Sequence, residues 1–153
     1  MRYLRKGDLY MNIARFLLPK NSVAYIFDYD TLRQGIEKIR YYGYTAIPVI
    51  TEDSKYVGTI SEGDFLWYLV EDAIAQAKGI DKESLEKTLI REVVMEEKNP
   101  PVCINTSIEE LLVQAMNQNF VPVIDDRGIF IGIVTRKDII KYFYENSLEK
   151  KEV

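Results

Sequence analysis

Residues 47–66 read IPVITEDSKYVGTISEGDFL, and residues 121–140 read VPVIDDRGIFIGIVTRKDII. The second stretch repeats the pattern of the first 74 residues later and without a gap. In each, an apolar strand, a polar turn and a second apolar strand lead into a helix that opens with a hydroxyl residue and has an aspartate three positions later. Two copies of one unit predict an α/β (α+β) fold of two β-α-β-β-α lobes related by a pseudo-twofold axis. Such a pair has a cleft between its halves, and we expect the function there.

The composition excludes most familiar catalytic chemistry. The 153 residues include no histidine and one cysteine, so the chain has no Ser-His-Asp or Cys-His pair and no histidine-liganded zinc. We therefore expect no enzyme, no catalytic residues, no metal and no cofactor. The net charge of −4 argues against nucleic acid as a partner, because nonspecific binding relies on clustered Lys and Arg.

The chain also carries no sign of a membrane or secretory role. Its longest apolar runs are about five or six residues, far short of the roughly 20 that span a bilayer. The N-terminus has charged residues but no apolar segment typical of a signal peptide. Cys103 cannot form an internal disulfide and lies in an apolar strand, where we expect a buried side chain. These features predict a cytoplasmic protein with no membrane partner.

Hydrophobic periodicity and capping residues predict the elements of the first lobe. They are a helix over 8–18, a strand over 23–27, a helix capped by Asp30 or Thr31 that ends near Gly43, strands over 46–50 and 56–60, and a helix over 62–78. A connecting helix over 81–92, with Asp81 as a suggested N-cap, leads to the second lobe.

The second lobe repeats this plan with one deletion. We expect a strand over 101–104, a helix over 108–116 capped by Thr106-Ser107, and a hairpin turn in which Gly128 takes a positive φ. Between the helix cap and the proline of the next strand, this lobe is two residues shorter than the first. We therefore expect the pockets of the two lobes not to be equivalent.

The hydroxyl and the aspartate at each helix start suit a nucleotide. Ser61 or Thr135 presents a hydroxyl beside unpaired backbone N–H groups at the positive end of a helix, where a phosphate binds well. Asp64 or Asp138 lies one turn along on the same face, where a carboxylate can accept both ribose hydroxyls. The alternative is that these residues only cap their helices. Two copies at one offset favour the binding hypothesis.

These residues resemble the cystathionine-β-synthase (CBS) domain, whose closing motif is Gly-h-h-[Ser/Thr]-x-x-Asp. The likeness covers roughly residues 8–146, and the whole chain resembles a stand-alone CBS pair, or Bateman module. It implies tandem CBS domains, with domain 1 at 8–78, a connecting helix at 79–89, domain 2 at 90–146 and a charged tail at 147–153. Such modules bind adenosine nucleotides in the inter-lobe cleft, and the resemblance implies the same here.

A narrower resemblance rests on residues 43–49 (GYTAIPV) and the shortened second lobe. Together they are similar to small stand-alone CBS proteins of Gram-positive bacteria that bind cyclic di-AMP. This resemblance implies cyclic di-AMP as the ligand, with AMP, ADP or ATP as alternatives.

In proteins that this chain resembles, each pocket is lined by residues of both lobes. The resemblance implies the same for both pockets here. The residues implied for the main pocket are Ala24, Tyr44, Thr45, Ala46 and Ile47 from lobe 1 and Thr135, Arg136 and Asp138 from lobe 2. Those implied for a second, weaker pocket are Val102, Phe120 and Val121 with Ser61 and Asp64. In the main pocket, the strand residues would hold the base, the aspartate the ribose, and the hydroxyl and arginine the phosphate.

The 74-residue offset places Arg136 at the position of Glu62. A guanidinium forms strong, often bidentate bonds to phosphate. A carboxylate about 4 Å from a phosphate charge would instead be repelled by roughly 4 kcal/mol at an effective dielectric constant near 20. We therefore expect one occupied pocket, the one that contains Arg136.

Apolar helix surfaces predict a homodimer. Residues 65–70 (FLWYLV) and 139–143 (IIKYF) carry more apolar surface than one small module needs. Most tyrosines should pack on helix faces, whereas Tyr44 precedes a strand at the pocket rim and could stack on a purine.

Three functions stay open at this point. The first is a nucleotide-sensing regulatory module that signals to an unknown protein partner. The second is an AMP, ADP or ATP energy-charge sensor with the same cleft, and the third is a structural subunit with vestigial pockets.

Overall fold

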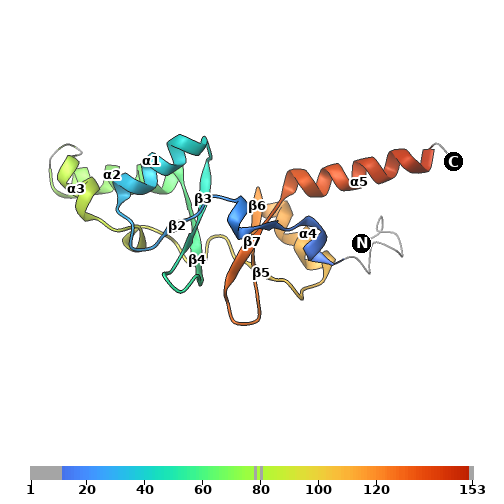
Figure 1. Cartoon of the computed structure of the whole chain (residues 1–153). Coiled ribbons are helices and arrows are strands. Elements are labelled where there is room, and N and C mark those ends of the chain that lie inside the picture. Colours follow the sequence, from blue (N-terminus) through green and yellow to red (C-terminus); the bar gives the residue numbers. More distant parts are fainter. Residues whose placement is uncertain (1–11, 78, 80, 152–153) are drawn as a thin grey trace. The chain divides into compact units, whose positions relative to one another are not determined.

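The two repeated stretches form two sheets of the same design. The computed structural model describes residues 12–77, 79 and 81–151 (Figure 1). The first sheet has the order β2-β3-β4. In it, β2 (Ile26–Phe27) runs parallel to β3 (Ala46–Ile50), and β3 runs antiparallel to β4 (Tyr56–Ser61).

The second sheet repeats this arrangement and adds one strand. Its order is β1-β7-β6-β5. Here β5 (Val102–Cys103) runs parallel to β6 (Phe120–Ile124), which pairs antiparallel with β7 (Phe130–Thr135). The added strand β1 (Leu18–Pro19) pairs antiparallel with the other edge of β7.

The registers of the two hairpins match residue by residue. Pro48 lies opposite Thr59, and Pro122 lies opposite Ile133, each 74 residues later. Both hairpins also shift register at the same step, between residues 49 and 50 in one and between 123 and 124 in the other. This equivalence confirms the predicted fold of two α+β repeats.

The helices follow the strands in the predicted order. They are α1 (Leu32–Tyr42), α2 (Glu62–Ala75), α3 (Lys82–Lys87), α4 (Ile108–Asn117) and α5 (Arg136–Lys151), with short 3₁₀ segments η2 (Ile13–Phe16), η3 (Lys20–Ser22) and η4 (Ile90–Glu92).

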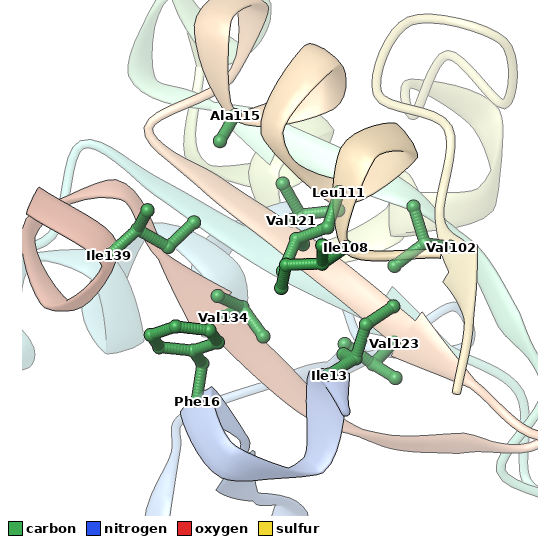
Figure 2. Close-up of a cluster of buried hydrophobic side chains, with 10 residues drawn as sticks. All are labelled: Ile13, Phe16, Val102, Ile108, Leu111, Ala115, Val121, Val123, Val134 and Ile139. Carbon is green, nitrogen blue, oxygen red and sulfur yellow. The ribbon is translucent and has the colours of Figure 1, made fainter. Parts of the chain in front are cut away.

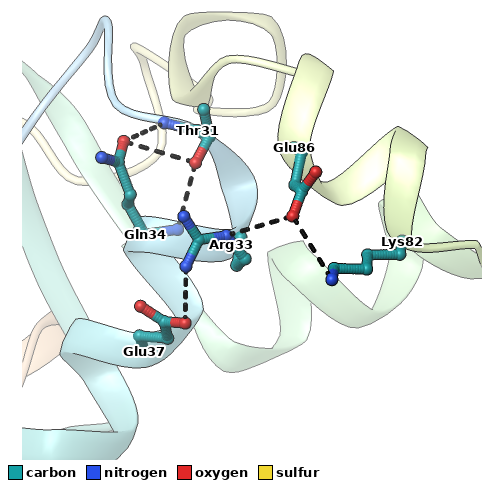
Figure 3. Close-up of polar contacts among 6 residues, drawn as sticks. All are labelled: Thr31, Arg33, Gln34, Glu37, Lys82 and Glu86. Carbon is teal, nitrogen blue, oxygen red and sulfur yellow. Dashed lines mark hydrogen bonds and ion pairs between the residues drawn. The ribbon is translucent and has the colours of Figure 1, made fainter.

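Side chains at the helix starts satisfy the free backbone N–H groups there. Thr31 and Gln34 form a reciprocal capping box on α1, which ends at Gly43 with φ of 70°. Asp81 caps α3, as predicted, and Ser107 caps α4. Figure 3 shows the capping box beside three exposed ion pairs, one within α1, one within α3 and one, Arg33–Glu86, between them. Each contributes little because water screens it.

The chain divides into two compact units that do not coincide with the two sequence repeats. We call Ala24–Lys98 the contiguous unit. The discontinuous unit joins the described residues up to Val23 to those from Asn99 onward. The division of the sequence into repeats at 8–78 and 90–146 is thus distinct from the division into compact units.

The core of the discontinuous unit contains residues from both of its segments. Figure 2 shows this cluster, in which Ile13 and Phe16 of η2 join apolar residues of β5, α4, β6, β7 and α5. The cluster comprises Ile13, Phe16, Val102, Ile108, Leu111, Ala115, Val121, Val123, Val134 and Ile139. The N-terminal segment therefore completes a core that the second repeat alone would leave open.

The contiguous unit gains its last core residues in the same way. Ile90 and Val93 of the segment after α3 are buried against its sheet and α1. Backbone hydrogen bonds fasten this segment, since Leu32 N donates to Thr88 O (2.9 Å) and Ile90 N donates to Asp30 O (2.8 Å).

Three predicted helices have different ends in the structure. The helix expected over 8–18 is only the 3₁₀ turn η2 within the described residues, because Leu18 and Pro19 pair with β7 instead; positions 8–11 lie outside the described residues. The helix expected over 62–78 ends at Ala75, and Ala77 has φ of 51°. The helix expected over 81–92 ends at Lys87, because the following residues bond to the loop before α1 and bury Ile90.

Two strands and two side chains also differ from expectation. The strands expected over 23–27 and 101–104 pair only at Ile26–Phe27 and Val102–Cys103. Asp30 does not cap α1, because its carboxylate accepts a hydrogen bond from Phe27 N (2.9 Å). Cys103 is half-buried rather than buried, since it lies on the edge strand β5.

Candidate functional site

At the start of α2, the carboxylate of Asp64 forms an ion pair with Lys98. Asp64 accepts a hydrogen bond from Ser61 N through Oδ2 (2.8 Å) and one from Lys98 Nζ through Oδ1 (2.8 Å). Burial of the Asp64 carboxylate would raise its pKa, but the hydrogen bonds from Lys98 and Ser61 outweigh this and hold the pKa below its ordinary value. Both carboxylate oxygens are therefore in use within the contiguous unit.

The surroundings of that ion pair are acidic. Lys98 also lines a hollow of about 590 Å³ together with Met95, Glu96 and Glu97. Glu62, the first residue of α2, is exposed and donates its backbone N–H to Thr45 O (2.9 Å). Carboxylates at the helix start and in the hollow disfavour an anionic ligand there.

The start of α5 also has a hydroxyl residue and an aspartate, but here the aspartate carboxylate forms no ion pair within the described residues. Thr135 Oγ1 accepts a hydrogen bond from Asp138 N (3.1 Å), so the cap is formed. The carboxylate of Asp138 is half-buried and has no partner among residues 12–77, 79 and 81–151. This carboxylate is thus available to accept hydrogen bonds from a ligand.

Arg136 adds a cation at this helix start. Its guanidinium donates from Nε to Ala115 O (2.7 Å), from Nη1 to Asn119 Oδ1 (3.1 Å) and from Nη2 to Met116 O (3.4 Å). It has no acidic partner within the described ranges. Its positive charge is therefore not neutralised by an ion pair.

The residues assigned to the main pocket from the first repeat all belong to the contiguous unit. Thr45 and Tyr44 are exposed, whereas Ile47 is buried in the sheet. The Tyr44 ring stacks on that of Tyr42, with centroids 5.6 Å apart and planes within 5°. Ala24 is half-buried and packs against the core of this unit. Tyr44 is 46% exposed, and its position at the rim of a pocket stays a prediction.

The residues assigned to the second pocket come from both compact units. Val102 and Val121 are core residues of the discontinuous unit, and half-buried Phe120 lies opposite Thr135. Ser61 and Asp64 belong to the contiguous unit. Each predicted pocket thus combines residues of both units, and its assembly stays a prediction.

Gln118 is a residue that the sequence reasoning missed. It occupies the position of Tyr44 in the second repeat and is 6% exposed. Its Nε2 donates to Pro100 O (3.2 Å) and to Gln114 Oε1 (3.0 Å), while its own Oε1 is the only buried side-chain polar atom in the described part of the chain without a partner. The second repeat therefore has a buried amide where the first has an exposed ring.

Neither a metal-ion cluster nor a membrane-spanning helix occurs in the described residues. No group of three or more His, Cys, Asp or Glu side chains in the described ranges could hold a metal ion. No helix among those residues has both the length and the apolar character needed to cross a bilayer.

Comparison with known proteins places this geometry in a family. The chain belongs to the CBS domain family, whose model matches residues 15–71 and 90–145. It is 26% identical over 129 residues to cyclic di-AMP receptor B of Bacillus subtilis (strain 168), and the match covers 84% of each chain. The predicted resemblance to a CBS pair is confirmed.

Solved structures agree with this assignment. The crystal structure of CbpB in complex with c-di-AMP superposes with a TM-score of 0.86 at 26% identity, covering 96% of this chain and 93% of that one. A CBS domain protein from Streptococcus pneumoniae TIGR4 gives a TM-score of 0.77 at 30% identity, with coverage of 88% and 86%.

Proposed function

We propose that this chain is a non-catalytic regulatory module that senses an adenine nucleotide, cyclic di-AMP before AMP, ADP or ATP. The ligand would lie between the strand residues Ala24 and Tyr44–Ile47 and the helix start at Thr135–Asp138. Occupancy of this pocket would change the surface that the module presents to a regulated protein in the cytoplasm. The repeats at 8–78 and 90–146 would serve as its two CBS domains.

The observation that carries the proposal is the difference between the two helix starts. Within the part of the chain that the structure describes, α5 offers a hydroxyl, a cation without an acidic partner and an unpartnered carboxylate. At α2 the equivalent carboxylate is paired with Lys98, and Glu62 replaces the arginine. A phosphate is stabilised beside the first set and repelled by the second, which supports one main pocket per chain.

Cyclic di-AMP is placed first because of the relatives. A curated relative is a cyclic di-AMP receptor, and a similar solved structure, CbpB, contains c-di-AMP. The dinucleotide has a second phosphate and a second adenine, which the adjoining pocket or a second copy of the chain would have to accommodate. Mononucleotides need only one set of these groups, and they are the second candidate for the same pocket.

A second copy of the chain is the assembly that we propose. On α2, Leu66, Trp67 and Ile74 are 61%, 68% and 74% exposed, and on α5 Ile140 and Tyr144 are 61% and 64% exposed. Large apolar side chains concentrated on two helices favour burial against another protein surface, and a twofold homodimer is the commonest way to bury them.

Calorimetric titration of the full chain with AMP, ADP, ATP and cyclic di-AMP tests the proposed function. We expect cyclic di-AMP to bind best and Arg136→Met to weaken it about ten- to a hundredfold, because a hydrogen bond to a charged group is worth about 1.5–3 kcal/mol. Glu62→Gln is the matched control at the other helix start and should leave affinity unchanged or slightly improved.

Two results would contradict the proposal. Binding of none of the four nucleotides would support the structural-subunit alternative. Unchanged binding by Arg136→Met, with loss of binding by Asp64→Ala, would show that the other pocket is the functional one.

A further inference from the structure

The C-terminal end of α4 differs from its counterpart in the first repeat. Helix α1 ends at Gly43, whose left-handed conformation lets Gly43 N donate to Ile39 O (2.9 Å). At the same place α4 has Asn117, and the next residue, Gln118, is extended with φ of −135°. Gln118 N still donates to Gln114 O (3.1 Å), so α4 forms the same closing hydrogen bond without a glycine.

Arg136 satisfies two carbonyls of α4 that lie beyond this closing hydrogen bond. The carbonyls of Ala115 and Met116 belong to the last turn of α4, where acceptors lack intrahelical partners. They accept hydrogen bonds from Nε (2.7 Å) and Nη2 (3.4 Å) of Arg136. A cation at a helix C-terminus is also stabilised by the helix dipole. The two hydrogen bonds thus hold the guanidinium at the C-terminal end of α4.

Asn119 holds the same arginine at two points. Its backbone carbonyl accepts from Arg136 N (2.9 Å), and its Oδ1 accepts from Nη1 (3.1 Å). The first repeat keeps the backbone bond, from Glu62 N to Thr45 O (2.9 Å), but has no corresponding side-chain bond among the described residues. The backbone bond is therefore a property of the fold, whereas the side-chain bond belongs to the repeat that carries the arginine.

We infer that Asn119 is a positioning residue, which holds the Arg136 guanidinium ready for the phosphate of a bound nucleotide. The inference rests on the proposed function. A guanidinium has five N–H groups, and the three contacts leave two without a partner in the described residues, one on each terminal nitrogen. Those two can donate to phosphate oxygens while the other three keep the fork in place. A side chain that is already ordered loses less entropy when the ligand binds.

The test is a double-mutant cycle on the full chain, measured by calorimetric titration with cyclic di-AMP. The variants are Asn119→Ala, Arg136→Met, the double variant, and Asn117→Ala as a control. Asn117 is also exposed and lies two residues away, and among the described residues its side chain bonds only to its own helix, at Val113 O (3.3 Å). Because Asn119 is exposed, we expect its substitution to leave the fold intact, which circular dichroism of each variant would check.

We expect Asn119→Ala to weaken binding about three- to tenfold, the scale of ordering one long side chain. Asn117→Ala should bind like the parent. In the Arg136→Met background, Asn119→Ala should have no further effect, because the arginine through which it acts is gone. A merely structural role for Asn119 would reduce affinity equally in both backgrounds.

The remaining outcomes separate this inference from the proposed function. If Arg136→Met weakens binding while Asn119→Ala matches the Asn117→Ala control, the positioning role is wrong and the proposed pocket stands. An equal loss from Asn119→Ala in both backgrounds also overturns the positioning role. A parent chain that binds neither cyclic di-AMP nor AMP, ADP or ATP removes the proposed function and the inference together.

Discussion

At the scale of single residues, the two repeats have diverged at the groups that would contact a ligand. Asp64 and Asp138 occupy equivalent positions, yet one is paired with Lys98 and the other has an unpartnered carboxylate in the described structure. Glu62 and Arg136 differ in charge at the first position of their helices. One fold therefore presents two helix starts of opposite electrostatic character.

The Asp64–Lys98 pair predicts a specific pH dependence of stability. Lys98→Met should reduce the free energy of unfolding at pH 7 by about 1 kcal/mol, since a charged hydrogen bond contributes about 1.5–3 kcal/mol and the half-exposed lysine is screened by water. The pKa of Asp64 is lowered in the folded state, so the pair stabilises fully above the ordinary value of 3.8. That stability is lost as the pH falls through the folded-state value.

Urea unfolding of the parent and Lys98→Met at pH 7 and near pH 3 would measure this effect. The difference between the two proteins should shrink at acid pH. Lys82→Met is the control, because Lys82 is 83% exposed and its Nζ lies 4.0 Å from Glu86 Oε1. This substitution should change the free energy of unfolding by less than about 0.5 kcal/mol. A difference that persists unchanged at acid pH would mean that Lys98 acts through packing rather than through charge.

At the scale of elements, one glycine lets the N-terminal segment join the second sheet. A Cβ on Gly132 would lie 2.1 Å from Leu18 O, which belongs to β1, and the residue has φ of 155°. Its equivalent in the first repeat, Gly58, has more room, with its nearest neighbours at 3.0 Å from a built Cβ. Equivalent glycines thus carry different constraints because only the second sheet has the extra strand.

We expect Gly132→Ala to destabilise the chain by about 3 kcal/mol, because the clash with backbone atoms cannot be relieved without separating β1 from β7. Gly58→Ala should cost about 1 kcal/mol, since small shifts of Val94 and Met95 make room. Urea unfolding followed by circular dichroism compares the two. Equal losses would show that β1 does not depend on this close approach.

The sequence predicted the middle of most elements and missed several of their ends. The 74-residue repeat determined the hairpins and their matching prolines, because alternating apolar residues and polar turns are local signals. The end of the connecting helix could not be predicted, since it depends on Ile90 reaching the core of the contiguous unit. Tertiary burial overrode local helix propensity there.

The candidate site was predictable to a similar extent. A motif marks Thr135, Arg136 and Asp138 in the sequence, and their role in binding stays a prediction. The contacts at the two helix starts were not predicted, because Lys98 lies 34 residues from Asp64, and Ala115 lies 21 residues from Arg136. Contacts at such separations have no local signal in a single sequence.

At the scale of the whole molecule, the proposed homodimer should be separable from the fold. We expect the parent chain to migrate at twice its mass of 17.8 kDa and the double variant Trp67→Glu, Ile140→Glu to migrate as a monomer, because unpaired charges on these two helices cannot be buried. Light scattering after gel filtration measures the mass. Val113→Glu, at a 50% exposed apolar residue of α4, should remain dimeric. A parent chain that is monomeric at micromolar concentration contradicts the proposal.

The discontinuity of one unit has a consequence for how the chain reaches its fold. Residues 24–98 separate the two segments of the discontinuous unit, and closing an unstructured loop of that length costs about 4 kcal/mol of chain entropy. Folding of the contiguous unit removes most of that cost, because it brings the beginning and the end of this unit together. Arg91 N, near its end, donates to Asp28 O, near its beginning (2.9 Å). We therefore expect the middle of the chain to fold first on the ribosome. The N-terminal segment then waits for β7, the last strand to be synthesised, before it can pair.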